Sequence, residues 1–207
     1  MITVLFKSIK KIQLTIVNLL IISGFSFAEP IGGVIESTGV TSLVRESERL
    51  ESDVGTDVNI YDEAETANGR MLIEFLDEEK LSLTENSLVY IDEAYYDPDP
   101  SKSKMAISMV RGTARFASGA GNRIKKQNVD VSTPTANITM RGTDFTTTID
   151  ELGRTMVVLL PDEETGASSG EIVVYNDGGE VVLTEAYAAT VVSSYDTPPT
   201  SSVIVQG

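Results

Sequence analysis

Carboxylates are the only abundant side chains in this sequence that could carry out acid–base chemistry. The 207 residues include 31 Asp and Glu but no His and no Cys. A Ser-His-Asp triad, a thiolate nucleophile and a zinc site of the usual ligands are therefore excluded. Two carboxylates could still cleave a glycosidic bond at a defined separation, with one in an apolar setting. No pair in the sequence is distinguished by such a setting, and we predict that the protein is not an enzyme.

Two acidic stretches could supply oxygen ligands to a hard cation. Asp92-Glu93 and Asp97-Pro98-Asp99 place several carboxylates within one predicted loop, and calcium binds such oxygens on a flexible backbone. Their order does not reproduce the twelve-residue EF-hand loop, and acidic residues beside proline are common in solvated turns. We therefore expect turn residues here, and we predict neither a metal nor another cofactor.

Three tyrosines near this loop are candidates for ligand contact. Tyr90, Tyr95 and Tyr96 combine apolar ring faces with polar hydroxyl groups, and a stacking platform for a sugar ring has this character. Tyrosines more often simply cover the rim of a β-structure. Recognition of a polysaccharide therefore remains an alternative function.

A short glycine-containing segment in the second half of the chain carries the strongest structural signal. Thr133-Pro134-Thr135-Ala136 combines β-branched residues with a proline entry, and Gly142 follows as a single glycine. This order predicts a strand, a tight turn or bulge, and a second strand. Asp144 follows the bend and could pair with Arg141 or Arg115 to fix it. The positions expected to determine the fold are Thr133, Pro134, Ala136, Arg141, Gly142, Thr143, Asp144 and Phe145.

An earlier segment repeats part of this pattern. Both segments place Arg-Gly-Thr at a predicted bend, with an aromatic residue close behind it. They are either a pair of related structural corners or a coincidence in a β-rich chain, since a three-residue echo is weak evidence of a repeat. In the first case the two arginines would bond buried carboxylates or carbonyls. The residues of this second corner are Arg111, Gly112, Thr113 and Phe116.

These segments resemble the signature of FecR-type domains, in which Thr-Pro-x-Ala runs into an Arg-Gly-Thr-x-Phe core. Leu88–Asp99 and Met105–Gly119 look like the middle portion of the family in the same order, so the resemblance covers roughly residues 31 to 192. It implies a jelly-roll-like β-sandwich. Family members that regulate iron uptake carry an anti-sigma segment and a membrane span ahead of this domain. Only 28 residues precede it here, which makes a sigma-factor regulator the less favoured variant.

Residues 1–28 have the organisation of a secretory signal peptide. Three lysines near the start precede an apolar stretch, Ile12–Ile22, and Ser26-Phe27-Ala28 places small residues at a cleavage site. Cleavage after Ala28 would give a periplasmic or extracellular protein that begins at Glu29. The alternative is an uncleaved anchor, but the apolar stretch is shorter than the roughly 20 residues that a spanning helix needs. We predict no integral membrane protein after cleavage.

The charge of the chain limits its partners. The formal net charge is −15, and loss of three lysines with the leader would make it −18. Such a surface repels phosphate backbones, so we predict no binding to nucleic acid. Without cysteines, no disulfide stabilises the fold. The mature length suits one independently folding domain with its own hydrophobic core.

Hydrophobic residues alternate with polar ones through most of the chain, which indicates β-strands. Arg70–Thr84 reads as a hairpin with a four-residue loop, and Asn176-Asp177-Gly178-Gly179 supplies the residues of a tight turn. We predict an all-β protein, an antiparallel two-sheet sandwich of jelly-roll-like form. This domain would cover residues 29–196, and residues 197–207 would be an extended tail or a truncated continuation.

These observations favour a non-enzymatic, secreted or periplasmic protein of the FecR type. Its expected role is binding or assembly with an envelope protein partner, by surface complementarity and edge-strand pairing. One alternative is a polysaccharide-binding adhesin or a virion component. Another is a periplasmic signal-transfer domain linked to iron-uptake regulation.

Overall fold

The structure is a computed structural model that describes residues 29–99, 102–119, 128–162, 166–168 and 170–205. The described residues form a single 17-stranded sheet without an α-helix, as their alternating hydrophobicity predicts. The strands are β1 Gly32–Thr38, β2 Thr41–Arg45, β3 Glu48–Glu51, β4 Asp57–Val58, β5 Glu63–Thr66, β6 Arg70–Phe75, β7 Lys80–Leu83, β8 Leu88–Tyr95, β9 Lys104–Ala117, β10 Asn128–Ser132, β11 Asn137–Arg141, β12 Asp144–Ile149, β13 Thr155–Leu160, β14 Glu171–Asn176, β15 Gly179–Leu183, β16 Ala188–Val192 and β17 Val203–Ile204.

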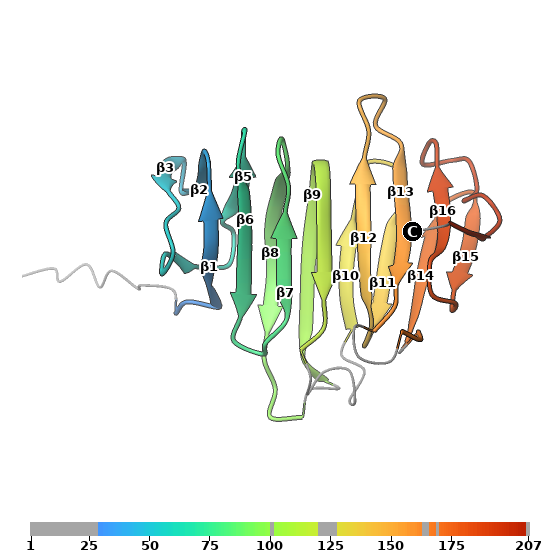
Figure 1. The fold of residues 1–207 in the computed structure, drawn as a ribbon, viewed down its shortest axis with the longest axis horizontal. Coiled ribbons are helices and arrows are strands. Elements are labelled where there is room, and N and C mark those ends of the chain that lie inside the picture. Colours follow the sequence, from blue (N-terminus) through green and yellow to red (C-terminus); the bar gives the residue numbers. More distant parts are fainter. Residues whose placement is uncertain (1–28, 100–101, 120–127, 163–165, 169, 206–207) are drawn as a thin grey trace, which may run out of the picture.

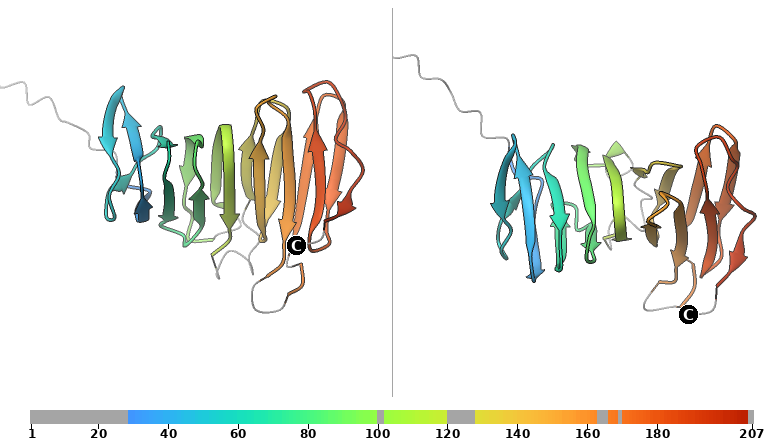
Figure 2. Two further views of the ribbon diagram at one scale, coloured as in Figure 1. Left: turned by 45° about the horizontal axis from the view of Figure 1, so that its top comes forward. Right: turned by 90° about the horizontal axis from the view of Figure 1, so that it is seen from above.

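The strands follow one another along the long axis of the molecule in roughly the order of the sequence (Figures 1 and 2). Hydrogen bonding arranges them in two ladders. Ladder A has the order β4-β1-β6-β7-β9-β12-β13-β16-β17. Ladder B has the order β3-β2-β5-β8-β9-β10-β11-β14-β15. Because β9 belongs to both, the ladders form one connected sheet.

Pairing is antiparallel except between β9 and β10, which run parallel. The predicted hairpin at residues 70–84 is confirmed, since β6 and β7 pair across four intervening residues. The predicted turn at residues 176–179 is confirmed as well, since it joins the paired strands β14 and β15. Strand β17 lies within the predicted tail and pairs with β16.

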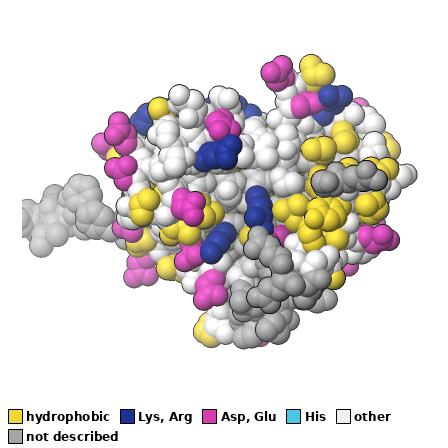
Figure 3. Space-filling view, viewed as in Figure 1, with side chains coloured by type: hydrophobic (Ala, Val, Ile, Leu, Met, Phe, Trp, Pro, Cys, Tyr) yellow, Lys and Arg dark blue, Asp and Glu magenta, His cyan; other side chains and the backbone are white. Residues whose placement is uncertain are grey.

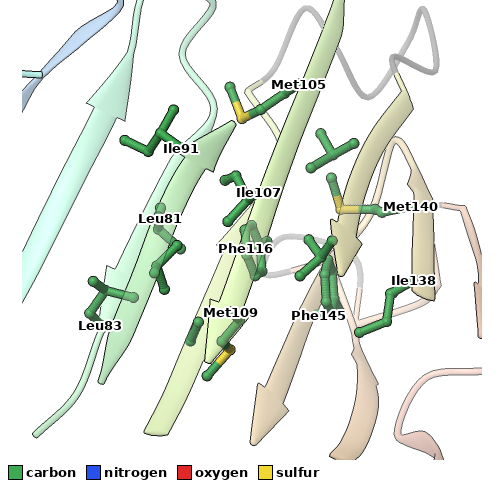
Figure 4. Packing of buried hydrophobic residues seen from close by; sticks show 14 of the residues in the cluster. Leu81, Leu83, Ile91, Met105, Ile107, Met109, Phe116, Ile138, Met140 and Phe145 are labelled. Atoms are coloured by element: carbon green, nitrogen blue, oxygen red, sulfur yellow. The ribbon is translucent and has the colours of Figure 1, made fainter. Parts of the chain in front are cut away.

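One hydrophobic core receives side chains from both ladders (Figure 4). In most of the strands alternate residues point inward, as the geometry of a β-strand requires. In β6 these are Met71, Ile73 and Phe75, and each is at most 3% exposed. Burial of this core provides most of the favourable free energy of folding, because the chain has no disulfide.

The all-β and mainly antiparallel character of the prediction is confirmed. The two-sheet, jelly-roll-like arrangement stays a prediction, since the pairings show one connected sheet. The predicted signal peptide, residues 1–28, lies outside the described residues. Within the described part of the chain, no helix is long and apolar enough to cross a membrane.

Candidate interaction face

Gly112 lies where β9 passes from ladder B to ladder A. Arg111 pairs with Leu88 in ladder B, whereas Gly112 pairs with Ile149 in ladder A. The glycine has a φ of +92°, a backbone conformation that residues with a Cβ rarely adopt. Ser87 packs against it, and the Ser87 hydroxyl accepts a 3.0 Å hydrogen bond from the amide of the next residue, Thr113. The first Arg-Gly-Thr segment is therefore a crossover between the ladders.

The chain also passes from ladder B to ladder A at the second Arg-Gly-Thr segment. Arg141 ends β11 in ladder B, and Asp144 begins β12 in ladder A. Gly142 between them has a φ of +60°. The side chain of Arg141 lies at the surface, where Nη1 is 3.6 Å from Oε1 of Glu171. In both segments a glycine in the left-handed region thus connects the ladders.

The two corners meet through their aromatic residues. Phe116 in β9 and Phe145 in β12 are directly opposite one another in the antiparallel pair. Their rings stack with centroids 4.8 Å apart and an interplanar angle of 10° (Figure 4). Both side chains are nearly fully buried. Farther along the same pair, the hydroxyls of Thr113 and Thr148 lie 3.0 Å apart. The two motif segments therefore pack as neighbouring strands.

Asp144 links the second corner to β9. Its carboxylate is 2% exposed, and Oδ2 lies 3.2 Å from Nη2 of Arg115. The backbone N–H of Ser118 donates to Oδ1 at 3.1 Å, and the Ser118 hydroxyl donates to the carbonyl of Thr143. Of the two arginines that the sequence suggested as partners, Arg115 thus forms an ion pair with Asp144. These contacts hold the start of β12 against the end of β9.

The Thr133-Pro134-Thr135-Ala136 segment is the turn between β10 and β11. The Thr133 hydroxyl donates to the Ala136 carbonyl at 2.9 Å and accepts from the Ala136 N–H at 3.0 Å. Thr155 of β13 donates to the Thr133 hydroxyl at 2.8 Å, and Thr135 donates to that of Thr155 at 2.7 Å. These buried hydroxyls join the turn between β10 and β11 to β13 of ladder A.

A cavity of about 540 Å³ opens on the outer face of ladder A beside these corners. Charged side chains of both signs line it. Nζ of Lys80 lies 3.3 Å from Oε2 of Glu74, and the Arg115–Asp144 pair lies on the same side. The lining residues are Leu72, Glu74, Glu78, Lys80, Ser82, Arg115, Ala117, Ser118, Gly119 and Asp144.

The outer face of ladder A changes in character along the molecule. Residues directly opposite one another point to the same face, and one such row crosses seven strands. It consists of Leu72, Ser82, Arg115, Thr146, Val158, Ala189 and Val203. The row is polar and charged in the middle and apolar toward the C-terminal end.

The apolar end of this face forms a group that we call the C-terminal patch: Met156, Val158, Leu160, Val191 and Val203. Met156 is opposite Val191, and Val158 and Val203 are both opposite Ala189. Met156 is 40% exposed and Val203 is 57% exposed, whereas Leu160 and Val191 are half-buried and Val158 is only 7% exposed. Figure 3 shows apolar side chains gathered over the part of the molecule where β13 and β16 lie. Sequence reasoning missed this patch, because its residues come from three separate strands.

The other candidates from the sequence lie apart from this face or are engaged elsewhere. The Tyr96 hydroxyl donates to the Ile31 carbonyl at 2.9 Å, and burial, with the nearby Asp77 carboxylate, raises the Tyr96 pKa. Tyr95 is exposed and donates to Asp97. Among the described residues, no three acidic side chains are grouped so that they could hold a metal ion.

A buried ion pair was also missed by sequence reasoning. The Asp62 carboxylate is fully buried and receives two hydrogen bonds of 2.8 Å from Arg45. The backbone N–H of Asn59 donates to it as well. The hydrogen bond to Asp62 raises the pKa of the Arg45 guanidinium. Since the two partners are 17 residues apart, no local motif indicates the pair.

Comparison with known proteins gives a family match and similar solved structures. Residues 62–162 match the family model described as FecR protein. Two crystal structures of a protein described as a "putative anti-sigma factor" from Parabacteroides distasonis are similar, each at 13% identity and a TM-score of 0.49. Each match covers 67% of this chain and 57% of the solved chain, so this chain spans little more than half of that protein. No curated protein matches.

The family match is shorter than the region over which the sequence resembles the family. It begins at the buried Asp62, contains both glycine corners and the stacked Phe116 and Phe145, and ends just after β13. The chain thus contains a FecR domain, over residues 62–162.

Proposed function

We propose that this is an exported FecR-domain protein that binds another protein of the cell envelope and catalyses no reaction. FecR-type domains are in general signalling domains without enzymatic activity, which supports the second part. The leader-like composition of residues 1–28 supports export to the periplasm or the cell exterior. The role is one of binding or assembly.

The C-terminal patch is the observation that carries this proposal. Exposed apolar side chains occur singly on most proteins, but a contiguous group with a polar surround marks a binding site. Here the group continues into the charged middle of the same face, where Lys80, Glu74, Arg115 and Asp144 form two ion pairs. A partner that covers both regions would gain free energy from apolar burial and orientation from the charges.

A shared core gives this face a rigid support. Side chains of ladders A and B pack into one hydrophobic cluster, which is how the two layers of a β-sandwich are joined. We propose this two-sheet, jelly-roll-like arrangement as the architecture behind the face. A face built on strands holds its side chains more firmly than one built on loops, so the partner would meet a largely preformed surface.

Affinity capture with paired variants tests the proposed function. The full chain is immobilised and exposed to envelope extract of the source organism, and a saturable partner is expected. Val203→Lys places a charge in the C-terminal patch and should abolish its capture. Val40→Lys is the matched control, because Val40 is 60% exposed and lies in the turn between β1 and β2. Equal capture by both variants, or no saturable partner at all, would contradict the proposal.

A further inference from the structure

The outer edge of β15 has the properties of a strand that can accept another one. β15 is the last strand of ladder B and pairs only with β14 among the described residues. Asn176 and Gly179 close the two-residue turn between these strands, and such a closing pair is hydrogen-bonded in tight hairpins. Alternation along the strand then directs the backbone N–H and C=O groups of Glu180 and Val182 away from β14.

The opposite edge of the same ladder is protected. Three of the four residues of β3 are charged, namely Glu48, Arg49 and Glu51. Nη2 of Arg49 is also 2.6 Å from Oε2 of Glu65. Charged side chains of this kind discourage pairing with another chain. In contrast, β15 has the sequence Gly-Glu-Val-Val-Leu, with a single charge in five residues. The two edges therefore differ in their capacity to bind an added strand.

We propose that β15 accepts an extended segment of a protein partner as an additional antiparallel strand, with a basic residue opposite Glu180 and an apolar residue opposite Val182. This inference rests on the proposed protein-binding function and specifies one place and one chemistry for it. Antiparallel addition is chosen because it is the more stable pairing per residue.

The side chains of β15 define the required sequence of the partner. Glu180 and Val182 lie on the outer face of ladder B, opposite Tyr175 and Val173, and Val182 is 44% exposed. Val181 points the other way and packs against the core. Antiparallel strands run in opposite directions. From its N-terminal side, the partner segment would therefore place an apolar residue opposite Val182, an apolar residue opposite Val181 and a basic residue opposite Glu180.

The charge of the chain favours a basic partner over a second copy. In a symmetric β15 pair centred on Val181, each Glu180 would lie opposite a Val182 and would find no cation. Two molecules of formal charge −15 would also repel each other. A cationic segment would be attracted by the acidic surface and would complement Glu180 directly.

Synthetic peptides test the proposal with the full chain. The probes are a fluorophore-labelled twelve-residue peptide with a central Thr-Val-Val-Lys-Thr segment, and a matched peptide with Glu in place of Lys. We expect saturable binding of the Lys peptide and affinity about tenfold lower for the Glu peptide. NMR amide shifts should be largest at Glu180 and Val182. No binding at millimolar concentration, or equal binding of both peptides, would overturn the proposal.

Two variants of β15 make the test specific to this edge. Val182→Pro removes an N–H that points outward, so it should abolish peptide binding while the pairing with β14 and the circular dichroism spectrum persist. Glu180→Lys should reverse the preference to the Glu peptide, and it tests the proposal even where the proline variant fails to fold. If Glu180→Lys leaves the affinities of both peptides unchanged, the proposal is contradicted.

The outcomes separate this inference from the proposed function. Partner capture that depends on Val203 but no peptide binding would overturn the β15 site and leave the C-terminal patch as the binding surface. Light scattering that shows a dimer, and a monomer for Val182→Pro, would show that a second copy occupies the edge. That result would overturn the proposed basic partner.

Discussion

Replacing Gly112 with alanine tests the crossover between the two ladders. The glycine has a φ of +92°, and a Cβ built on it would collide with Oγ of Ser87 and lie 2.5 Å from the α-carbon of Ser87. The hydroxyl could rotate away, but the α-carbon belongs to the backbone. The alanine methyl group can therefore be accommodated only if the chain at Ser87 and β9 move apart.

The loss of stability expected for Gly112→Ala has two parts that the structure allows us to separate. A non-glycine residue in the left-handed region costs about 1–2 kcal/mol, and overpacking in a tightly packed site costs about 1–3 kcal/mol more. Gly112→Ala should therefore lower the free energy of unfolding by about 3 kcal/mol or more. Gly153 is the matched control, because its φ is +79° and a Cβ there would have no atom within 4 Å. Gly153→Ala should show the first part alone, about 1 kcal/mol.

Urea unfolding followed by far-ultraviolet circular dichroism measures both losses on the same scale. The predicted order is a clearly larger loss for Gly112→Ala than for Gly153→Ala. Ser87→Gly combined with Gly112→Ala should recover only part of the difference, since the backbone at position 87 would still lie 2.5 Å from the new methyl group. Equal losses at the two glycines would refute the reasoning that close packing at Ser87 fixes the crossover.

Three further predictions concern buried polar groups. Thr147 is fully buried, and its hydroxyl has no hydrogen-bond partner among the described residues; Thr147→Val should raise the free energy of unfolding by about 1 kcal/mol in urea titrations. Tyr96→Phe should cost about 1 kcal/mol at pH 8 through loss of the hydrogen bond to Ile31. Because the pKa of Tyr96 is raised in the folded state, the unfolded chain deprotonates first, so this contribution is lost as pH rises above about 10. Asp62→Asn should cost about 3 kcal/mol, since Arg45 would lose a buried charged partner.

Each of these predictions has an opposing outcome. Destabilisation by Thr147→Val would show that the hydroxyl is satisfied. A difference between wild type and Tyr96→Phe that stays constant from about pH 8 to well above pH 10 would show that Tyr96 titrates normally. Glu85→Gln is the control for Asp62→Asn, because the Arg70–Glu85 pair is exposed and such pairs contribute about 0–1 kcal/mol. Similar losses for the two substitutions would contradict the assigned importance of the buried pair.

Local patterns in the sequence predicted the strands well because alternation and turn residues act over short distances. The hairpin of β6 and β7 and the tight turn at residues 176–179 are examples, since each depends on residues that are close in the chain. The glycine between Arg141 and Thr143 likewise predicted a bend without any knowledge of the ladders. The change from ladder B to ladder A at that glycine could not be predicted from spacing.

Interactions between distant segments could not be predicted from local patterns. The Arg45–Asp62 pair, the hydrogen bonds of Thr155 to the threonine turn, and the C-terminal patch all join strands whose order in the sheet the sequence does not state. The arrangement of the strands in two ladders also explains why the two Arg-Gly-Thr segments adopt similar backbone conformations. Both copies occur where the chain changes ladder, so the same local conformation is needed twice.

Amide hydrogen exchange of the complex with the captured partner most directly tests the claim that the C-terminal end is the binding end. We predict slower exchange in β13, β15, β16 and β17, and unchanged exchange in β1 to β5. Protection confined to β1 to β5 would contradict the account.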